Sequence, residues 1–130
     1  MARQQMAAGR DAAICIGRIT RRQDFLAANS GVRVPLPPFV LLVRPAGQVL
    51  PRVGFTVSRR VGNAVARNRA RRRLREAARL LLPHHAIAGA DHIFIARARQ
   101  PELPELPFGE LLSFMEKGLL KAGRKLGERS

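Results

Sequence analysis

The chain has 130 residues, enough for one domain with a buried core, and a net charge of +15 from 24 basic and 9 acidic residues. Its one cysteine, Cys15, excludes a disulfide framework and a cysteine-based metal site, and it fits a reducing, cytosolic setting. No apolar run reaches the roughly 18 residues that a membrane span needs, so we expect no membrane partner.

Residues 1–17 are expected to form a flexible basic arm, because they show neither a helical nor a strand period. This stretch is rich in Ala and Arg, and Asp11 is its one acid. It therefore also faintly resembles an organellar transit peptide, which stays open as an alternative, whereas the lack of an apolar stretch argues against a secretory signal. We place the folded domain at 18–126 and a short tail at 127–130.

A helix and two strands are predicted next. Thr20 can cap a short helix over Arg21–Ala28, and the Asn-Ser-Gly sequence at 29–31 is a favoured helix end. The alternation over Val32–Val34 predicts a short edge strand before a proline-rich stretch. The continuously apolar run Phe39–Val43 predicts a strand that is buried on both faces or lines a groove.

The rest of the domain supplies two more strands and two more helices. Arg52–Ser58 alternates as a strand does and is expected to form an antiparallel meander with the preceding strand. Asp91–Ala98 is the fourth strand, Gln100–Pro107 an exposed connection, and Phe108–Leu126 an amphipathic helix. With a long helix before the fourth strand, the order is α-β-β-β-α-β-α, which predicts an α+β fold with helices on a four-stranded mixed sheet.

That long helix is rich in arginine. It is predicted over Ala64–Leu82, with Asn63 as its N-cap and Pro83 as its stop. It holds seven arginines against one acid, Glu76, and residues 52–79 together carry a net charge of +9. Like charges one turn apart destabilise an isolated helix, so this concentration indicates a polyanionic neighbour such as nucleic acid. High arginine content can also reflect genomic base composition.

The faces of the helix and of the strands predict a groove. At about 100° per residue, three of the arginines share one flank of the helix. If the Phe residues of the two central strands face the core, their neighbours face the other side of the sheet. A groove with an apolar and polar floor and a cationic wall is how proteins hold single-stranded nucleic acid. The residues of this predicted groove are Phe25, Val40, Leu42, Thr56, Ser58, Arg67, Arg71 and Arg75.

One stretch carries a family resemblance. The run GFTVSRRVGNAVARNR at residues 54–69, which continues to Glu76, closely resembles the protein component of bacterial ribonuclease P. Arg67–Arg69 stands where that family has its Arg-Asn-Arg motif. The likeness extends to the first helix and to the predicted strands, and it covers about residues 18–120.

The resemblance implies a small basic subunit that is not itself the catalyst. In this family a partner RNA carries the active site and its magnesium ions, and the two together hydrolyse a phosphodiester to release the 5′ leader of precursor tRNA. The expected partners are therefore ribonuclease P RNA and precursor tRNA, in the cytoplasm, with no protein partner evident. No catalytic residue and no metal or cofactor held by the protein alone is expected. The resemblance also implies a left-handed β-α-β crossover, in a fold type shared with a domain of a ribosomal protein.

By the same resemblance, the candidate residues divide between two RNAs. The groove becomes the site of the tRNA leader. The other polar residues of the turn and helix point elsewhere and are expected to clamp phosphates of the catalytic RNA, with the helix N-terminus as a further anion site. Arg67 is assigned to both the groove and this set. These residues are Arg59, Arg60, Asn63, Arg67, Asn68, Arg69, Arg72 and Arg73.

The chain departs from the family pattern in its aromatic residues. The family often has an aromatic where this chain has Leu42, and another after the first helix, where this chain has Asn29. The chain has no Tyr and no Trp. Base stacking contributes about 1–3 kcal/mol per base, so we expect this groove to depend more on charge than on stacking. Phe25 is the candidate stacker, and a core role for it is equally open.

Other functions remain as alternatives. A ribosomal or ribosome-assembly RNA-binding protein would share the composition and the general fold type. A DNA-binding protein would lay the arginine helix in a major groove, but such readers usually mix Asn, Gln and Ser with Arg at base-facing positions. His84, His85 and Asp91 leave a metal site open, although a His pair in a loop is more often solvated and Asp91 more often structural.

Overall fold

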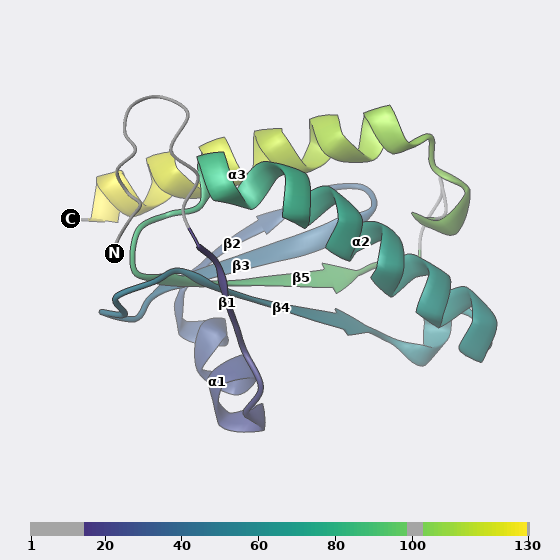
Figure 1. The fold of residues 1–130 in the computed structure, drawn as a ribbon, viewed down its shortest axis with the longest axis horizontal. Helices are drawn as coiled ribbons and strands as arrows, with labels where there is room; N and C mark the ends of the chain where they lie inside the picture. The colour runs from purple at the N-terminus through teal and green to yellow at the C-terminus, as the bar shows by residue number, and fades with distance from the viewer. Residues whose placement is uncertain (1–14, 99–102, 130) are drawn as a thin grey trace.

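The structure, a computed structural model, describes residues 15–98 and 103–129 and consists of one mixed sheet with helices on both faces (Figure 1). The elements in chain order are β1 (Gly17–Arg18), α1 (Arg22–Ala27), η2 (Ala28–Ser30), β2 (Val32–Pro35), β3 (Phe39–Pro45), β4 (Arg52–Val57), η3 (Arg59–Val61), α2 (Ala64–His85), β5 (Ala90–Ala96), η4 (Leu103–Glu105) and α3 (Phe108–Arg129). The α+β class is as predicted.

The sheet has five strands in the order β1-β4-β5-β3-β2, one more than predicted. The predicted meander is wrong, because β5 lies between β3 and β4, antiparallel to the first and parallel to the second. Phe94 of β5 is thus paired with Leu41 on one side and Phe55 on the other. Six of the seven residues of β5 are buried, as are the first five of β3, and strands that are apolar on both faces occupy the centre of a sheet.

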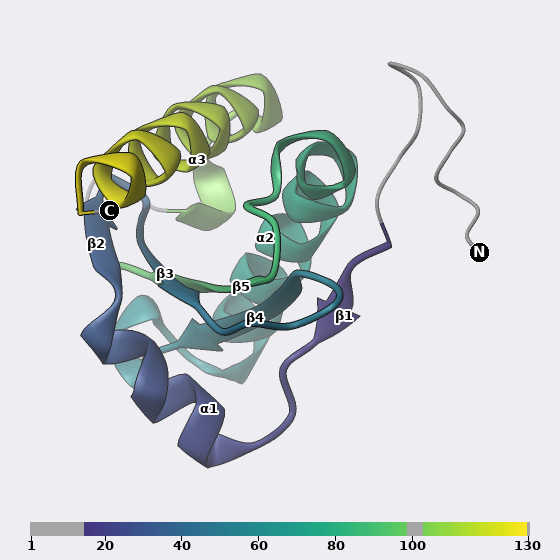
Figure 2. The same ribbon diagram turned by 90° about the vertical axis from the view of Figure 1, so that its left-hand side faces the viewer.

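The parallel neighbours β4 and β5 are joined by α2. In Figure 2, which looks along the strands, the chain runs away from the viewer in β4, returns through α2 above the sheet, and enters β5 on the left of β4. This path is left-handed, as the resemblance implies, and it is an exception to the right-handed rule that nearly all such crossovers follow.

The larger core lies between the sheet and the helices α2 and α3. One alternating set of strand side chains faces these helices, including Phe39, Leu41 and Phe94. α2 contributes mainly small residues here, such as Ala70 and Ala77, which let the helix lie close to the sheet. The other set of strand side chains faces α1, so the predicted division between the two faces is confirmed.

The smaller core lies under α1. Val40, Leu42 and Ile93 pack there with Ile19 and Ala28, and Phe25 packs against their edge. This cluster fixes α1 on the face opposite α2 and α3 (Figure 1). The molecule therefore has three layers, with the sheet in the middle.

Several predicted boundaries need correction. Thr20 does not cap α1, because the N-cap residue is Arg21 and its side chain makes no capping bond. Pro83 does not stop α2, which continues to His85 and ends where the N–H of Ala86 donates to the carbonyl of Leu82. A proline near a helix end removes only one intrahelical bond, and here the flanking turn still packs on the core.

The termini and one connection also differ from the predictions. β1 begins at Gly17, whose N–H donates to the Pro51 carbonyl at 2.8 Å, so the predicted arm ends earlier than expected; residues 1–14 lie outside the described residues. The predicted tail is mostly helical, since α3 extends to Arg129. The connection predicted to be exposed instead buries Leu103 and Leu106 in the main core, while residues 99–102 lie outside the described residues.

Candidate nucleic-acid interface

The arginines of α2 are presented by a capped and well-seated helix. The side-chain oxygen of Asn63 accepts from the Ala66 N–H at 2.9 Å, which confirms the predicted N-cap. Ala70, Leu74 and Ala77 are buried against the sheet, so most of the intervening positions face outwards. The sequence places most of its arginines at those outward positions.

Most residues predicted to bind the catalytic RNA are exposed at the N-terminal half of α2. Arg59 and Arg60 lie in η3, directly before the helix. None of the arginines in η3 or α2 forms an ion pair with a carboxylate within the part of the chain that the structure describes. Their charge is therefore available to an external anion. The exposed members of the predicted set are Arg59, Arg60, Asn63, Asn68, Arg69 and Arg72.

Two further arginines are half-buried and held by neutral partners. The guanidinium of Arg67 donates to the carbonyl of Gly62 at 3.0 Å, and that of Arg71 donates to the side chain of Asn68 at 3.2 Å. Such bonds orient a guanidinium without neutralising it, so both side chains keep their positive charge.

Arg73 does not occupy the predicted outward position. Its guanidinium donates to the carbonyl of Leu106 and lies over the ring of Phe108, 5.8 Å from the centroid. Its Nε is buried and has no hydrogen-bond partner among the described residues. Arg73 therefore holds the turn before α3, and its half-buried guanidinium is engaged within the chain.

Arginines predicted for two different RNAs share one surface. A shallow hollow of about 540 Å³ on the outer side of α2 is lined by Arg71 and Arg75, from the predicted leader groove, together with residues predicted to bind the catalytic RNA. The two predicted sets therefore meet on the surface of α2, and the assignment of each set to one RNA stays a prediction. We call this surface the arginine hollow; its lining residues are Val65, Asn68, Arg69, Arg71, Arg72 and Arg75.

The predicted leader groove is divided by the sheet. Phe25, Val40, Leu42 and Thr56 lie on the α1 side, whereas helix α2, which carries the three arginines, lies on the opposite side of the sheet (Figure 1). Val40 and Leu42 are on the predicted face but buried beneath α1, at 7% and 5% exposure, so they cannot form an open floor. Ser58 lies beyond the end of β4, in the turn into η3. A single groove containing all eight residues is therefore ruled out.

Phe25 and Thr56 do line a pocket together. This Phe25 pocket, of about 410 Å³, lies between α1 and the edge of β4, and its lining residues are Thr20, Arg22, Phe25, Leu26 and Thr56. Phe25 is half-buried and packs against the smaller core, so its ring is both an anchor of α1 and part of an open surface. Arg22 supplies the cation that the sequence analysis expected from α2.

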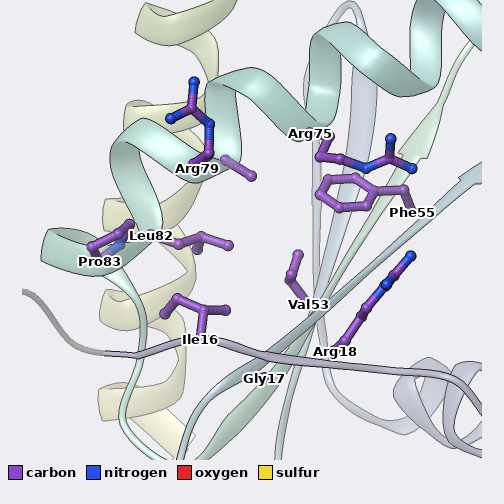
Figure 3. Close-up of a pocket in the computed structure, with 10 residues that line it drawn as sticks. Ile16, Gly17, Arg18, Val53, Phe55, Arg75, Arg79, Leu82 and Pro83 are labelled. Carbon is purple, nitrogen blue, oxygen red and sulfur yellow. The ribbon is translucent and has the colours of Figure 1, made fainter.

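Arg75 reaches a second concave surface on the α2 side. A groove of about 520 Å³ runs between β1, β4 and the C-terminal half of α2 (Figure 3). We call it the Phe55 groove; its lining residues are Ile16, Gly17, Arg18, Val53, Phe55, Arg75, Ala78, Arg79, Leu82 and Pro83. Sequence reasoning missed it, because β1 has only two residues and no detectable period. The sequence signal that could have indicated this groove was the spacing of Arg75 and Arg79, which lie one helical turn apart.

The residues considered for a metal are engaged otherwise. Asp91 is fully buried and accepts two hydrogen bonds from Arg52, at 2.8 and 2.7 Å. His92 is also fully buried; its Nε2 accepts from the N–H of Ile87, and its Nδ1 donates to the Arg52 carbonyl. His85 lies 3.6 Å from Glu116 of α3. Among the described residues, no group of three His, Cys, Asp or Glu side chains is placed to hold a metal ion.

No helix in residues 15–98 and 103–129 is both long enough and apolar enough to cross a bilayer.

Comparisons with known proteins agree on one family. The family model described as ribonuclease P matches residues 17–123. A protein of Paramagnetospirillum magneticum, a ribonuclease P protein component, is 43% identical over 114 residues, which cover 83% of this chain and 84% of that protein. Another from Erythrobacter litoralis is 52% identical over 79 residues, 61% of this chain and 65% of that relative.

Solved structures give the same result. The ribonuclease P protein of Thermotoga maritima superposes with a TM-score of 0.68 at 28% identity, over 78% of this chain and 94% of that one. The Staphylococcus aureus protein gives 0.66 at 29% identity, over 81% and 94%. The chain therefore belongs to the ribonuclease P protein family, whose members are protein components of the bacterial ribonuclease that processes the 5′ ends of tRNAs.

Proposed function

We propose that this chain is the non-catalytic subunit of ribonuclease P and binds the catalytic RNA through η3 and the outer side of α2. The observation that carries the proposal is the set of arginines in η3 and on the outer side of α2. Its guanidinium groups have no carboxylate partners among the described residues, and they surround the N-terminus of a helix, which favours anions. A phosphate backbone supplies the charge that this surface lacks.

The leader of precursor tRNA is proposed to bind at the Phe25 pocket. A single strand needs a cation for its phosphates and a flat side chain for its bases, and Arg22 and Phe25 provide one of each. Thr56 adds a hydroxyl at the floor. With one aromatic ring available, this site depends on charge as much as on stacking.

Hydrolysis is assigned to the RNA partner. When bound, magnesium ions held by that RNA would activate water and stabilise the leaving oxygen of the phosphodiester. The side chains of this chain bind and orient RNA, because the interface offers guanidinium and amide donors rather than an acid–base pair. We propose that the complex acts in the cytoplasm, on precursor tRNA.

The proposal is tested by reconstitution. The purified full chain is added to a bacterial ribonuclease P RNA at low magnesium concentration, and cleavage of precursor tRNA is followed. We expect the chain to restore cleavage, and we expect the double change Arg67→Ala with Arg69→Ala to raise the protein concentration needed for half-maximal activity.

Lys117→Ala with Lys121→Ala is the matched control, because it also removes two charges and both lysines are exposed on α3, away from the proposed interface. Failure of the parent chain to restore cleavage would contradict the proposal and favour a ribosomal RNA-binding role. An equal effect of the double lysine change would show that net charge, and not this surface, governs binding.

A further inference from the structure

The Phe55 groove lies on the opposite face of the sheet from the Phe25 pocket, so one binding site cannot include both. Adjacent residues of β4 separate them: the ring of Phe55 faces α2, and Thr56 faces α1. The groove nevertheless adjoins the arginine hollow, since Arg75 lines both. A strand bound along α2 would reach it without crossing the sheet.

The floor of the groove is flat and apolar. The ring of Phe55 stacks on that of Phe94, with centroids 5.9 Å apart and planes inclined by 18°. Phe94 is fully buried, whereas Phe55 is half-buried and lines the groove. Val53 and Ile16 extend the apolar surface beside it (Figure 3). Phe55 therefore ends a ring stack that a further flat group can continue.

The rim of the groove is cationic. Arg18 comes from β1, while Arg75 and Arg79 come from α2, and all three side chains are exposed. Among the residues that the structure describes, no acidic one lines the groove. Within the described part of the chain, no hydrogen bond or ion pair engages these three guanidinium groups. An occupant therefore needs an apolar flat part and a negatively charged part.

We propose that the Phe55 groove binds one unpaired nucleotide of an RNA strand, with its base against Phe55 and its phosphates between Arg18 and Arg79. The volume of about 520 Å³ falls in the range of small-ligand sites. An apolar peptide would leave three cations without partners. A base within a duplex would already be stacked on its neighbours and could not reach the floor.

This inference rests on the proposed function, because it assigns a second RNA contact to the same subunit. It adds a site on the α2 side that distinguishes unpaired from paired RNA. Every base has a flat face that can stack on an aromatic side chain. The site would therefore select an unpaired nucleotide and not a particular base.

The test uses the full chain and a short fluorescent oligouridylate, with a second oligonucleotide of equal length that carries abasic residues. Phe55→Leu keeps an apolar side chain on Phe94 but removes the flat ring. We expect it to weaken oligouridylate binding about tenfold, the size of one stacked base, and to leave the abasic strand nearly unaffected. Phe55→Tyr keeps the ring and is expected to restore binding.

Arg79→Gln provides a second variant that leaves the core untouched, because this side chain is exposed. It should weaken both oligonucleotides, since both carry phosphates. Arg124→Gln removes an equal charge from the exposed surface of α3 and is the control, with no specific loss expected.

The outcomes separate the two proposals. If the parent chain binds RNA and restores cleavage but Phe55→Leu binds the oligouridylate as the parent does, the groove proposal alone is overturned. An equal loss for the abasic strand in Phe55→Leu would also overturn it, because the ring would then matter only for folding. If the parent chain neither binds RNA nor restores cleavage, the proposed function itself fails.

Discussion

Arg52 joins α1 to the sheet and is not part of the RNA-facing surface. Its guanidinium makes two hydrogen bonds to buried Asp91, and a third nitrogen lies 3.5 Å from Asp24 of α1. Hydrogen bonding to Asp91, the largest effect, raises the pKa of Arg52 above its ordinary value. Arg52 belongs to the cationic stretch 52–79, but its charge is neutralised within the chain by Asp91 and Asp24.

Arg52→Met is expected to lower the free energy of unfolding by about 3 kcal/mol, because it leaves the buried carboxylate of Asp91 without a partner. Urea denaturation measures this loss. Adding Asp91→Asn should recover part of it by removing the buried charge. Arg33→Met, at an exposed position of β2, is the control and should change stability by less than about 0.5 kcal/mol. A small effect of Arg52→Met would contradict the structural role of the pair.

His92 makes the stability depend on pH. Burial, the largest effect, lowers its pKa below the ordinary value of 6.5, because the charged imidazolium would lose its hydration inside the core; the hydrogen bond to the Arg52 carbonyl opposes this effect. The unfolded chain therefore binds a proton more readily. The stabilisation is present above pH 6.5 and is lost as the pH falls through the folded pKa.

We expect the urea midpoint of the parent chain to fall when the pH is lowered from 7 to 5.5. His92→Gln removes the titrating group, and although it is less stable at pH 7, its midpoint should depend less on pH over this range. Equal pH slopes in the two proteins would show that other groups cause the dependence.

At the scale of elements, α1 is positioned by close contact with the sheet. A Cβ atom at Gly54 would lie 2.6 Å from Cε1 of Phe25, so glycine is required for the ring to approach β4. The short helix has neither a side-chain cap nor a fully buried residue of its own. Its place therefore depends on Phe25, on Asp24 and on the cluster under η2.

Gly54→Ala is expected to displace the ring of Phe25, lower stability by about 1–3 kcal/mol and weaken binding of precursor tRNA relative to mature tRNA. Thermal unfolding and binding titrations measure the two effects. Gly123→Ala is the matched control, because a Cβ there meets nothing within 4 Å; on helix α3 it should stabilise by roughly 0.5–1 kcal/mol. If Gly54→Ala leaves the binding of precursor tRNA relative to mature tRNA unchanged, the leader does not bind at the Phe25 pocket.

At the scale of the whole molecule, charge is distributed unevenly over three layers. The chain carries a net charge of +15. Many of its cations line the arginine hollow and the Phe55 groove, which are both on the α2 side. The sheet separates this side from the Phe25 pocket. The two proposed RNA-binding surfaces therefore lie on opposite faces of the sheet, so binding at one leaves the other accessible.

Binding to the RNA partner is expected to weaken steeply with salt, by about 0.7 to 0.9 log units per log unit of salt for each phosphate neutralised. Arg69→Gln should reduce the slope by about that amount, because one phosphate contact is lost. Lys121→Gln should leave the slope unchanged. A nearly flat salt dependence in the parent chain would refute the assignment of the arginines to phosphates.

Local patterns determined much of this protein. The N-cap at Asn63, the outward arginines of α2 and the alternation of β4 follow from the periods of helix and strand and from local hydrogen bonding, so the sequence predicts them. The long motif at residues 54–69 predicted the family, and the family predicted the left-handed crossover. The sequence did not predict that α2 continues past Pro83, but this continuation adds only about one turn to the predicted helix.

Only the tertiary structure decided what depends on residues far apart in the chain. The left-handed path from β4 through α2 to β5 put α2 on the face of the sheet opposite α1, and this separated the predicted groove into two sites. The pairing of Arg52 with Asp91 and the turn of Arg73 towards Leu106 join positions 39 and 33 residues apart. Such contacts cannot be predicted from the local periodicity of the sequence, because long-range pairing is fixed by the packing of whole elements and not by the preference of any single segment.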